Sequence, residues 1–340
     1  MTLGRSTTCL SLLHDAALLV DIDDELLESV RVWLPLHAEA TSATQSPANG
    51  ATIEVRAATV DDDAVHARPD DEAAPGAPTL VLFAGVKAHE AAGDVIVLRS
   101  RAAVAGRISL AERRARISCA SVARDDVPST QRATDLYSML TLSAAFLVGR
   151  LGAALVHAGA VVDPDGRAWL LVGDTHAGKT TTCVSLVHAG WSFLADDQVV
   201  LRRDGDAIVA EGWPRHAHLD EGWDESRVTG TRGALDLRAR WGDRWRSRAP
   251  LGGLLFPRVV ADAPTSVSPL HAAAAFAGLV RQSPWLMADR GAAPAVIELL
   301  RDACSRPSFA LSLGRDSYAR GDVLAARLGP ALSVANGAER

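Results

Sequence analysis

At 340 residues, the chain is long enough for two domains or for one large domain. Hydrophobic residues make up 48% of it, which is ample for a sizeable core. The formal net charge of −6 excludes bulk attraction to nucleic acid or to an anionic membrane, and no apolar run of about 18 residues predicts a transmembrane helix.

Residues 1–130 predict a smaller, mostly-β domain of the α+β class. Short apolar segments with strand-like alternation are separated there by turn-rich and acidic stretches; they are 26–36, 52–60, 79–83, 94–98, 104–110 and 115–122. Consecutive carboxylates at 61–63 and 70–72 stand near prolines and a glycine. This composition indicates a solvated acidic loop rather than a metal site.

A helical pattern replaces the strand pattern from 129 to 152. Apolar side chains recur with the spacing of a largely buried helix, at Leu136, Met139, Leu140, Leu142, Leu147 and Leu151. We therefore predict a domain of unknown role over 1–130 and a nucleotide-binding domain over 131–330. The latter opens with apolar strands at 154–162 and 168–172, joined by a tight Asp-Pro-Asp-Gly turn into a hairpin.

Directly after the hairpin, residues 173–180 read G-x-x-x-x-G-K-[ST], the pattern of a phosphate-binding loop. An apolar strand precedes it and a helix-forming stretch follows it, which is the context that the motif requires. Backbone N–H groups of such a loop and the helix N-terminus attract phosphate. The residues expected to bind the nucleotide are Gly173, Asp174, Thr175, His176, Ala177, Gly178, Lys179, Thr180 and Thr181.

Lys179 and Thr180 have the most specific predicted roles in this loop. Lys179 should reach the β- and γ-phosphates, and the Thr180 hydroxyl should bind Mg²⁺. The chain contains only two lysines, Lys87 and Lys179, and every other basic side chain is arginine. A lysine thus stands where a compact ammonium is needed and where the planar fork of arginine fits poorly.

The chain after the loop predicts a mixed α/β domain. The helix should end near 188–190. Further strands are expected at 191–195, 198–202, 207–211, 251–260 and 309–313, and helices at 268–280, 292–302 and 322–328. Residues 213–248 show little periodicity.

Two adjacent acids, Asp196 and Asp197, end the strand that follows the loop helix. One can orient a metal ion and the other can accept the proton of an attacking hydroxyl. His157 lies in the first hairpin strand, where it either packs in the core or points into the cleft. Arg215 and Arg248 are both candidates for a charge-neutralising arginine. Four tryptophans either pack the core or stack on a base or substrate: Trp213, Trp223, Trp241 and Trp245.

Three segments together resemble the HPr kinase/phosphorylase family. They are Val156-His157-Ala158-Gly159-Ala160, the loop at 173–180, and Gly190-Trp191-Ser192-Phe193-Leu194-Ala195-Asp196-Asp197. The family shows a His-Gly or His-Ala strand, a loop of the form G-D-S-G-x-G-K-S and a G-h-x-h-h-A-D-D segment. The match is firm over about residues 153–202.

The resemblance implies a phosphoenolpyruvate carboxykinase-like P-loop domain with a mixed sheet, and transfer of phosphate from Mg-ATP to a protein serine. By motif position, Asp196 would be the proton acceptor and Asp197 its partner near the metal, which Thr180 also binds. His157 would be the histidine of the cleft, and Lys179 would complete the catalytic group.

The chain also departs from that family. His176 and Ala177 replace the Ser-Gly part of the loop, and no clear Gly-rich segment of the kind tied to phosphorolysis follows downstream. Residues 1–130 do not look like the family's usual N-terminal domain. The chain is more similar to HPr-kinase-related proteins of peptide natural-product pathways, which phosphorylate a serine of a small precursor peptide.

The leading hypothesis is an ATP- and Mg²⁺-dependent serine kinase that acts on a protein or peptide. The alternative is a nucleotide-binding regulatory or assembly ATPase without kinase activity, although a mere binder needs no base beside its phosphates. Chain length and the lack of a metal-ligand cluster disfavour a carboxykinase-type metabolic enzyme. We expect no nucleic-acid or membrane partner, and a homo-oligomer is compatible with the sequence.

The four cysteines are far apart and form no C-x-x-C pair. They are therefore expected to be reduced thiols of a cytoplasmic protein. Asp15 interrupts the short apolar run near the N-terminus, so no signal peptide is predicted.

Overall fold

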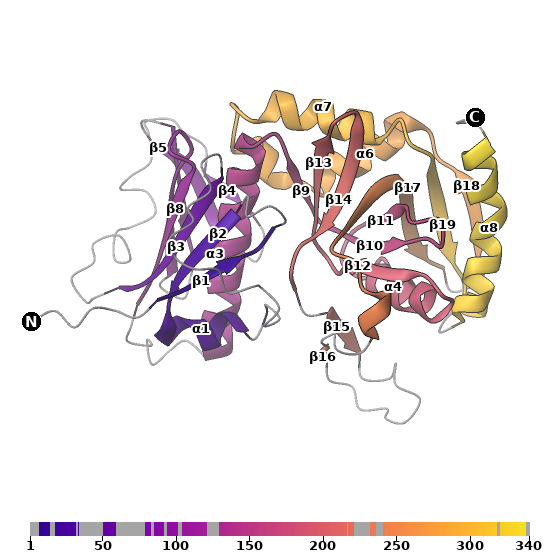
Figure 1. The fold of residues 1–340 in the computed structure, drawn as a ribbon, viewed down its shortest axis with the longest axis horizontal. Coiled ribbons are helices and arrows are strands. Elements are labelled where there is room, and N and C mark those ends of the chain that lie inside the picture. The colour runs from indigo at the N-terminus through magenta and orange to yellow at the C-terminus, as the bar shows by residue number, and fades with distance from the viewer. Residues whose placement is uncertain are drawn as a thin grey trace, which may run out of the picture. The chain divides into compact units, whose positions relative to one another are not determined.

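The computed structural model describes residues 7–13, 18–31, 33, 50–58, 79–82, 85–91, 94–100, 104–120, 129–215, 217–220, 232–235, 241–260, 262–317 and 320–337. The chain divides into two compact units (Figure 1). The first comprises Met1–Gly152 and Pro284–Val296, and the second comprises Ala153–Ser283 and Ile297–Arg340. The acidic runs at 61–63 and 70–72 lie outside the described residues.

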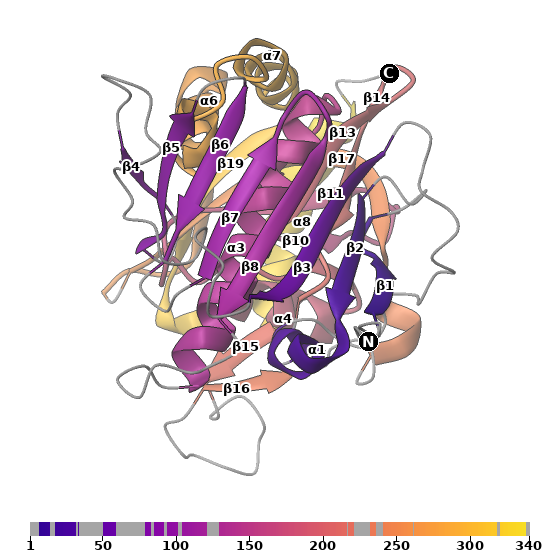
Figure 2. The same cartoon turned by 90° about the vertical axis from the view of Figure 1, so that its left-hand side faces the viewer.

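The first unit is a mixed sheet with helices on it. Its strands are β1 (Thr7–Ser11), β2 (Leu18–Asp23), β3 (Ala51–Ala58), β4 (Leu80–Val81), β5 (Lys87–Ala91), β6 (Val95–Arg99), β7 (Val104–Ser109) and β8 (Arg114–Ala120). They are ordered β1-β2-β3-β8-β7-β6-β5-β4, and β3 runs parallel to both of its neighbours. Helices α1 (Asp24–Arg31) and α3 (Ser129–Arg150) pack together against this sheet, with α3 behind it in Figure 2.

Helix α3 accounts for the position of the division between the units. The sequence pattern predicts a boundary at residue 130, whereas the division falls after Gly152. The reason is packing, because α3 lies against β3, β7 and β8 of the first unit. Its side chains Leu136, Tyr137 and Phe146 are at most 1% exposed, so the helix contributes a large part of that unit's core.

The second unit is built on a sheet that mixes parallel and antiparallel pairs, as the sequence predicts. Its strands are β9 (Ala154–Val156), β10 (Ala158–Val162), β11 (Ala168–Val172), β12 (Ser192–Ala195), β13 (Val199–Asp204), β14 (Ala207–Gly212), β17 (Arg248–Val259), β18 (Ser266–Pro269) and β19 (Ser308–Leu313). The main path is β12-β10-β11-β17-β14-β13-β9, and β19 pairs with β17 and β18. The β10–β11 hairpin is confirmed, and β11 is parallel to β17.

The remaining described elements after residue 152 are short strands, helices and 3-10 turns. They are β15 (Ala217–Asp220), β16 (Arg232–Leu235), α4 (Lys179–His188), α6 (Ala272–Arg281), α7 (Ala293–Ala303), α8 (Gly321–Gly337), and the 3-10 turns η4 (Gly242–Arg244), η5 (Pro284–Met287) and η6 (Arg315–Ser317). Of these, η5 and the start of α7 belong to the first unit. Strands β15 and β16 pair only with each other among the described strands. Among all the residues that the structure describes, no helix combines the length and apolarity needed to cross a bilayer.

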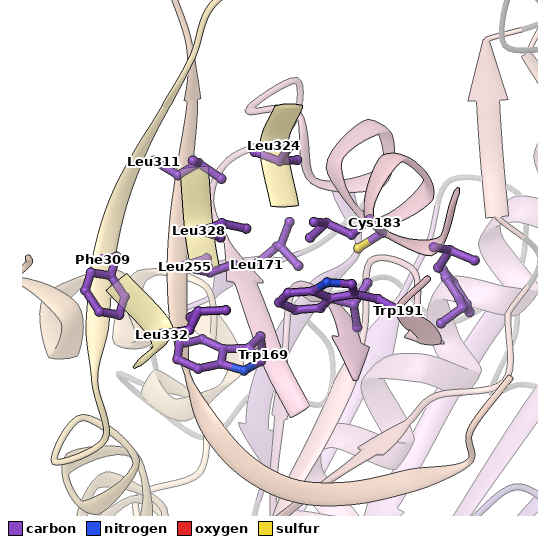
Figure 3. Close-up of a cluster of buried hydrophobic side chains, with 14 residues drawn as sticks. Trp169, Leu171, Cys183, Trp191, Leu255, Phe309, Leu311, Leu324, Leu328 and Leu332 are labelled. Atoms are coloured by element: carbon purple, nitrogen blue, oxygen red, sulfur yellow. The ribbon is translucent and has the colours of Figure 1, made fainter. Parts of the chain in front are cut away.

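A hydrophobic core fixes β11 and α4, which flank the predicted phosphate loop. Trp169 and Leu171 of β11 meet Cys183 of α4 and Leu328 of α8 in this core (Figure 3). Each of these four side chains is at most 1% exposed. A fully buried side chain of this size contributes about 1.5–3 kcal/mol, so the loop is held from both ends by well-packed elements.

Three predicted elements differ from the structure. The segment 26–36 is expected to alternate like a strand, but its first part belongs to helix α1, which ends at Arg31 and buries Leu26, Leu27 and Val30 on one face. The strand expected over 154–162 is interrupted at His157, whose backbone N–H bonds to the Gln282 carbonyl instead of a strand partner, at 2.9 Å. The helix expected from 268 begins only at 272, because Ser266–Pro269 forms edge strand β18. Proline suits an edge strand, since it cannot donate a backbone hydrogen bond.

Candidate active site

The predicted phosphate loop joins the end of β11 to the start of α4, so the expected strand, turn and helix are all present. Gly178 immediately precedes the helix with φ of 96°, a conformation that glycine adopts without strain. A Cβ at this position would lie 2.8 Å from Leu313 Cδ1. The backbone conformation therefore favours glycine here, and a Cβ would in addition force the end of the Leu313 side chain to move. Phosphate binding by the loop remains a prediction.

Lys179 is the first residue of α4, and its side chain is only 5% exposed. Its ammonium donates to the carbonyls of Gly173 and Asp174, at 2.9 and 3.1 Å. Asp197 Oδ1 lies 3.8 Å from the same nitrogen. Burial lowers the pKa of Lys179, and the carboxylates of Asp197 and Asp196 oppose that shift. The ammonium is thus directed along the loop toward the acids.

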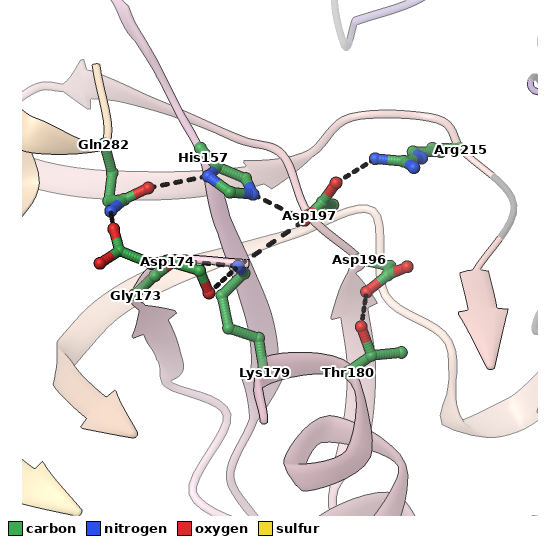
Figure 4. A network of polar contacts seen from close by, with 9 residues as sticks. All are labelled: His157, Gly173, Asp174, Lys179, Thr180, Asp196, Asp197, Arg215 and Gln282. Atoms are coloured by element: carbon green, nitrogen blue, oxygen red, sulfur yellow. Dashed lines mark hydrogen bonds and ion pairs between the residues drawn. The ribbon is translucent and has the colours of Figure 1, made fainter. Parts of the chain in front are cut away.

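The two adjacent acids contact different partners, as Figure 4 shows. Asp196 follows β12, is 3% exposed, and accepts a hydrogen bond from the Thr180 hydroxyl at 2.7 Å. The carboxylate of Asp196 therefore lies next to the hydroxyl that the motif assigns to a metal ion. Thr181, the next residue of the predicted nucleotide site, is partly buried in α4.

Asp197 instead lies at the centre of a cationic group. Its Oδ1 is 2.8 Å from His157 Nε2, and its Oδ2 accepts a hydrogen bond from Arg215. Burial works against the charge of Asp197, but the hydrogen bond with His157 and the charges of Arg215 and Lys179 hold its pKa below the ordinary value. The site therefore keeps this carboxylate ionised.

The backbone of Asp197 is itself unusual, with φ of 68°. Positive φ is uncommon outside glycine, and aspartate tolerates it better than most residues. Such conformations persist where the surrounding structure holds them, and they cluster at functional sites. This turn at the end of β12 is what sends two consecutive carboxylates to different partners.

The structure brings together only some of the candidate residues. Arg215 joins the group around Asp197, whereas Arg248 begins β17 with an exposed side chain. His176, with φ of 67°, is exposed within the loop, as is Thr175. The tryptophans Trp213, Trp241 and Trp245 are buried or packed against the core, and Trp223 lies outside the described residues.

Gln282 is a member of the network that the sequence motifs do not indicate. It directly follows α6 and is 6% exposed. Its side chain contacts both His157 and Asp174. It lies 125 residues beyond His157 in the sequence, so no local spacing points to it.

Comparisons with known proteins agree with the family resemblance. No family model matches the chain. It is 33% identical over 100 residues to a protein named HPr kinase/phosphorylase from Chlorobium phaeobacteroides, a match that covers 29% of this chain and 27% of that protein. It is 35% identical over 94 residues to a protein of the same name from Bacillus cytotoxicus, covering 27% of this chain and 29% of that protein.

These two matches confirm the HPr kinase-like resemblance, and the chain spans less than a third of the length of these relatives. A solved structure, the Hpr(Ser) kinase/phosphatase from Coxiella burnetii, is also similar, with a TM-score of 0.32 and 11% identity. That comparison covers 52% of this chain and 94% of the other.

Proposed function

We propose that this chain is an ATP-dependent kinase that transfers the γ-phosphate to a serine hydroxyl of a protein or peptide. The observation that supports this best is the distance of 3.8 Å between the loop lysine Lys179 and Asp197, a carboxylate also bound to His157 and Arg215. A regulatory nucleotide binder has no need for an ionised acid beside its phosphates. A phosphoenolpyruvate carboxykinase-like character of the nucleotide unit is part of the same proposal.

The residues present fit a magnesium-bound triphosphate. The loop offers backbone N–H groups at a helix N-terminus, a buried ammonium on Lys179, and the Thr180 hydroxyl beside Asp196. Within the described ranges, no group of three or more His, Cys, Asp or Glu side chains could hold a metal alone. Magnesium usually takes one or two carboxylates together with phosphate oxygens and water, which suits this set. Bound Mg-ATP would supply the γ-phosphoryl group that is transferred.

The geometry favours an exchange of the roles that motif position assigns to the two acids. Asp196 is buried against the Thr180 hydroxyl, so we assign it to the metal side of the site. The Asp197 side chain is 23% exposed and faces the group of His157, Lys179 and Arg215. We therefore assign Asp197 to the acceptor side, where its ionised carboxylate can accept a hydrogen bond and then the proton of the serine hydroxyl.

The three partners of Asp197, namely Lys179, Arg215 and His157, also have a place in this scheme. The acceptor oxygen forms its bond to phosphorus as the bond to the leaving ADP oxygen breaks, and negative charge spreads over the transferred group. Lys179 is a buried and Arg215 a largely buried positive side chain, and both can neutralise this charge in a low-dielectric site. His157 holds Asp197 by a hydrogen bond of 2.8 Å and so orients the carboxylate.

Incubation with γ-labelled ATP, Mg²⁺ and serine-containing peptides or proteins tests this function. We expect label on a serine of at least one acceptor, and loss of that label in both Lys179→Ala and Asp197→Asn. Release of labelled inorganic phosphate with no labelled acceptor would instead favour the regulatory ATPase. Absence of any nucleotide binding would refute both functions.

A further inference from the structure

We propose that Gln282 is a positioning residue that fixes the ring of His157, and through it the carboxylate of Asp197, by linking His157 to Asp174 of the phosphate loop. This role rests on the proposed kinase function. It is carried by the hydrogen-bond chemistry of one buried amide that lies between a carboxylate and an imidazole, as drawn in Figure 4.

The contact with Asp174 determines which way the amide faces. Gln282 Nε2 lies 2.7 Å from Asp174 Oδ1. A carboxylate only accepts hydrogen bonds, so the NH₂ end of the amide must face Asp174. The carbonyl end, Oε1, then faces the opposite way, toward the ring of His157.

The Gln282 amide in turn determines the orientation of the His157 ring. Gln282 Oε1 lies 2.7 Å from His157 Nδ1. A carbonyl oxygen also only accepts, so Nδ1 must carry a hydrogen and donate it. Nε2 is thereby the nitrogen that meets Asp197 Oδ1, at 2.8 Å, and since a carboxylate only accepts, this nitrogen donates as well. A ring flip would break both contacts, so the amide selects a single ring orientation.

Hydrogen bonds to backbone carbonyls hold the segments around His157 and Gln282 together. The His157 N–H donates to the Gln282 carbonyl at 2.9 Å, in place of a strand partner. The Ser283 hydroxyl donates to the Leu155 carbonyl at 3.4 Å. The end of α6 is therefore attached to the break between β9 and β10. Side-chain contacts therefore run from Asp174 to Gln282, then to His157 and then to Asp197. They connect the phosphate loop to the acid that we assign to the acceptor proton.

A merely structural role predicts a different response to substitution. If Gln282 only satisfied buried polar groups, its replacement would lower stability and leave the turnover of the folded enzyme unchanged. If it positions His157, turnover falls while nucleotide affinity is largely kept, because its contacts reach the acceptor side through Asp197. Loss of the partner that orients a metal-bound histidine costs about 10–100-fold in affinity or activity, and we take the same range for the partner of His157.

Moving the carboxylate from position 174 to position 282 in two steps separates a positioning role from a purely structural one. In Gln282→Glu, two carboxylates face each other, and we expect kcat to fall about 10–100-fold with a smaller change in the KM for ATP. Adding Asp174→Asn restores a donor to that contact. The glutamate can then accept from Asn Nδ2 with one oxygen and from His157 Nδ1 with the other. We expect the double variant to regain at least about tenfold in kcat over Gln282→Glu, by reversal of the same effect.

Gln131 provides the matched control. Its Nε2 donates to Asp135 Oδ1 at 2.6 Å, the same pair of groups within helix α3. Gln131→Glu therefore creates the same carboxylate pair away from the site, and we expect it to keep the wild-type kcat. A loss in Gln282→Glu that Asp174→Asn does not reverse, in folded proteins that still bind nucleotide, would overturn the positioning role.

A spectroscopic measurement on the wild-type protein tests the contact even if the Gln282 variants fail to fold. In wild-type protein labelled with ¹⁵N-histidine, the His157 signals are assigned by their loss in His157→Phe. We expect a proton on Nδ1; an unprotonated Nδ1 would overturn the proposal. If no acceptor is ever labelled, the kinase function fails, but this measurement still tests the contact between Gln282 and His157.

Discussion

Asp197→Asn is the substitution that most directly separates phosphate transfer from nucleotide binding. Asparagine keeps the size of the side chain and removes its charge. His157, Arg215 and Lys179 then share a pocket without their common anion, and the Arg215 and Lys179 side chains are only 10% and 5% exposed. We expect acceptor labelling to fall at least about 100-fold, the lower end of the range for loss of a general base.

Stability should fall as well, because the variant leaves charge-assisted hydrogen bonds unmade. Loss of a partner from a buried, charged contact costs about 1–3 kcal/mol. For a unit of about 150–250 residues this corresponds to a decrease of about 2–12 °C in Tm. Nucleotide binding should persist or strengthen, since phosphate oxygens can replace the missing carboxylate as the anion.

The stability difference should depend on pH in a defined direction. Because the folded-state pKa of Asp197 is depressed, its contribution is fully present above the pKa of an unfolded aspartate, about 3.9. It is lost as pH falls from there through the folded-state pKa. Wild-type and Asp197→Asn unfolding curves should therefore differ most at neutral pH and converge in acid.

Thermal unfolding from neutral pH down to well below the unfolded-state pKa of about 3.9, nucleotide titration and acceptor labelling make up the assay. Asp302→Asn is the control, since Asp302 is also paired with an arginine, Arg203, but at the protein surface, where such pairs contribute little. Unchanged labelling in Asp197→Asn would refute its role. Loss of nucleotide binding as severe as in Lys179→Ala would show that Asp197 belongs to the binding site instead.

Three further outcomes follow from individual residues. Lys179→Ala should abolish nucleotide turnover measured by ADP release; wild-type turnover would exclude this loop as the phosphate site. Gly321→Ala would place a Cβ 1.8 Å from a carbonyl oxygen of α4, so thermal unfolding should show a loss of about 1–3 kcal/mol. Gly329→Ala lies inside helix α8 and meets nothing within 4 Å, so it should be neutral or stabilising by up to about 1 kcal/mol. Burial raises the pKa of the Cys183 thiol well above its ordinary value. Iodoacetamide at pH 8 should therefore label the partly exposed Cys9 much faster than Cys183, and equal labelling rates would contradict the packed core.

The phosphate loop and its flanking elements could be predicted from the sequence because their determinants are local. A strand, a glycine at the turn and a lysine at the helix start lie within about a dozen residues of one another. The adjacent acids at the end of β12 could be found for the same reason. Apolar periodicity likewise indicated α3 as a buried helix, but it could not indicate which unit the helix packs against, because its partners β3, β7 and β8 lie earlier in the chain.

The partner that each acid of the site contacts is decided by tertiary contacts. Asp196 and Asp197 are equivalent in sequence, and only the left-handed turn at Asp197 sends one to Thr180 and the other to His157. Gln282 lies 108 residues beyond Asp174 in the sequence. The carboxylate of Asp174, which is on another element, sets the orientation of the Gln282 amide. The sequence by itself therefore determined the phosphate-loop motif and the presence of two acids after it. The pairing of each acid, and the ring orientation of His157, were decided by contacts that form only when distant segments pack together.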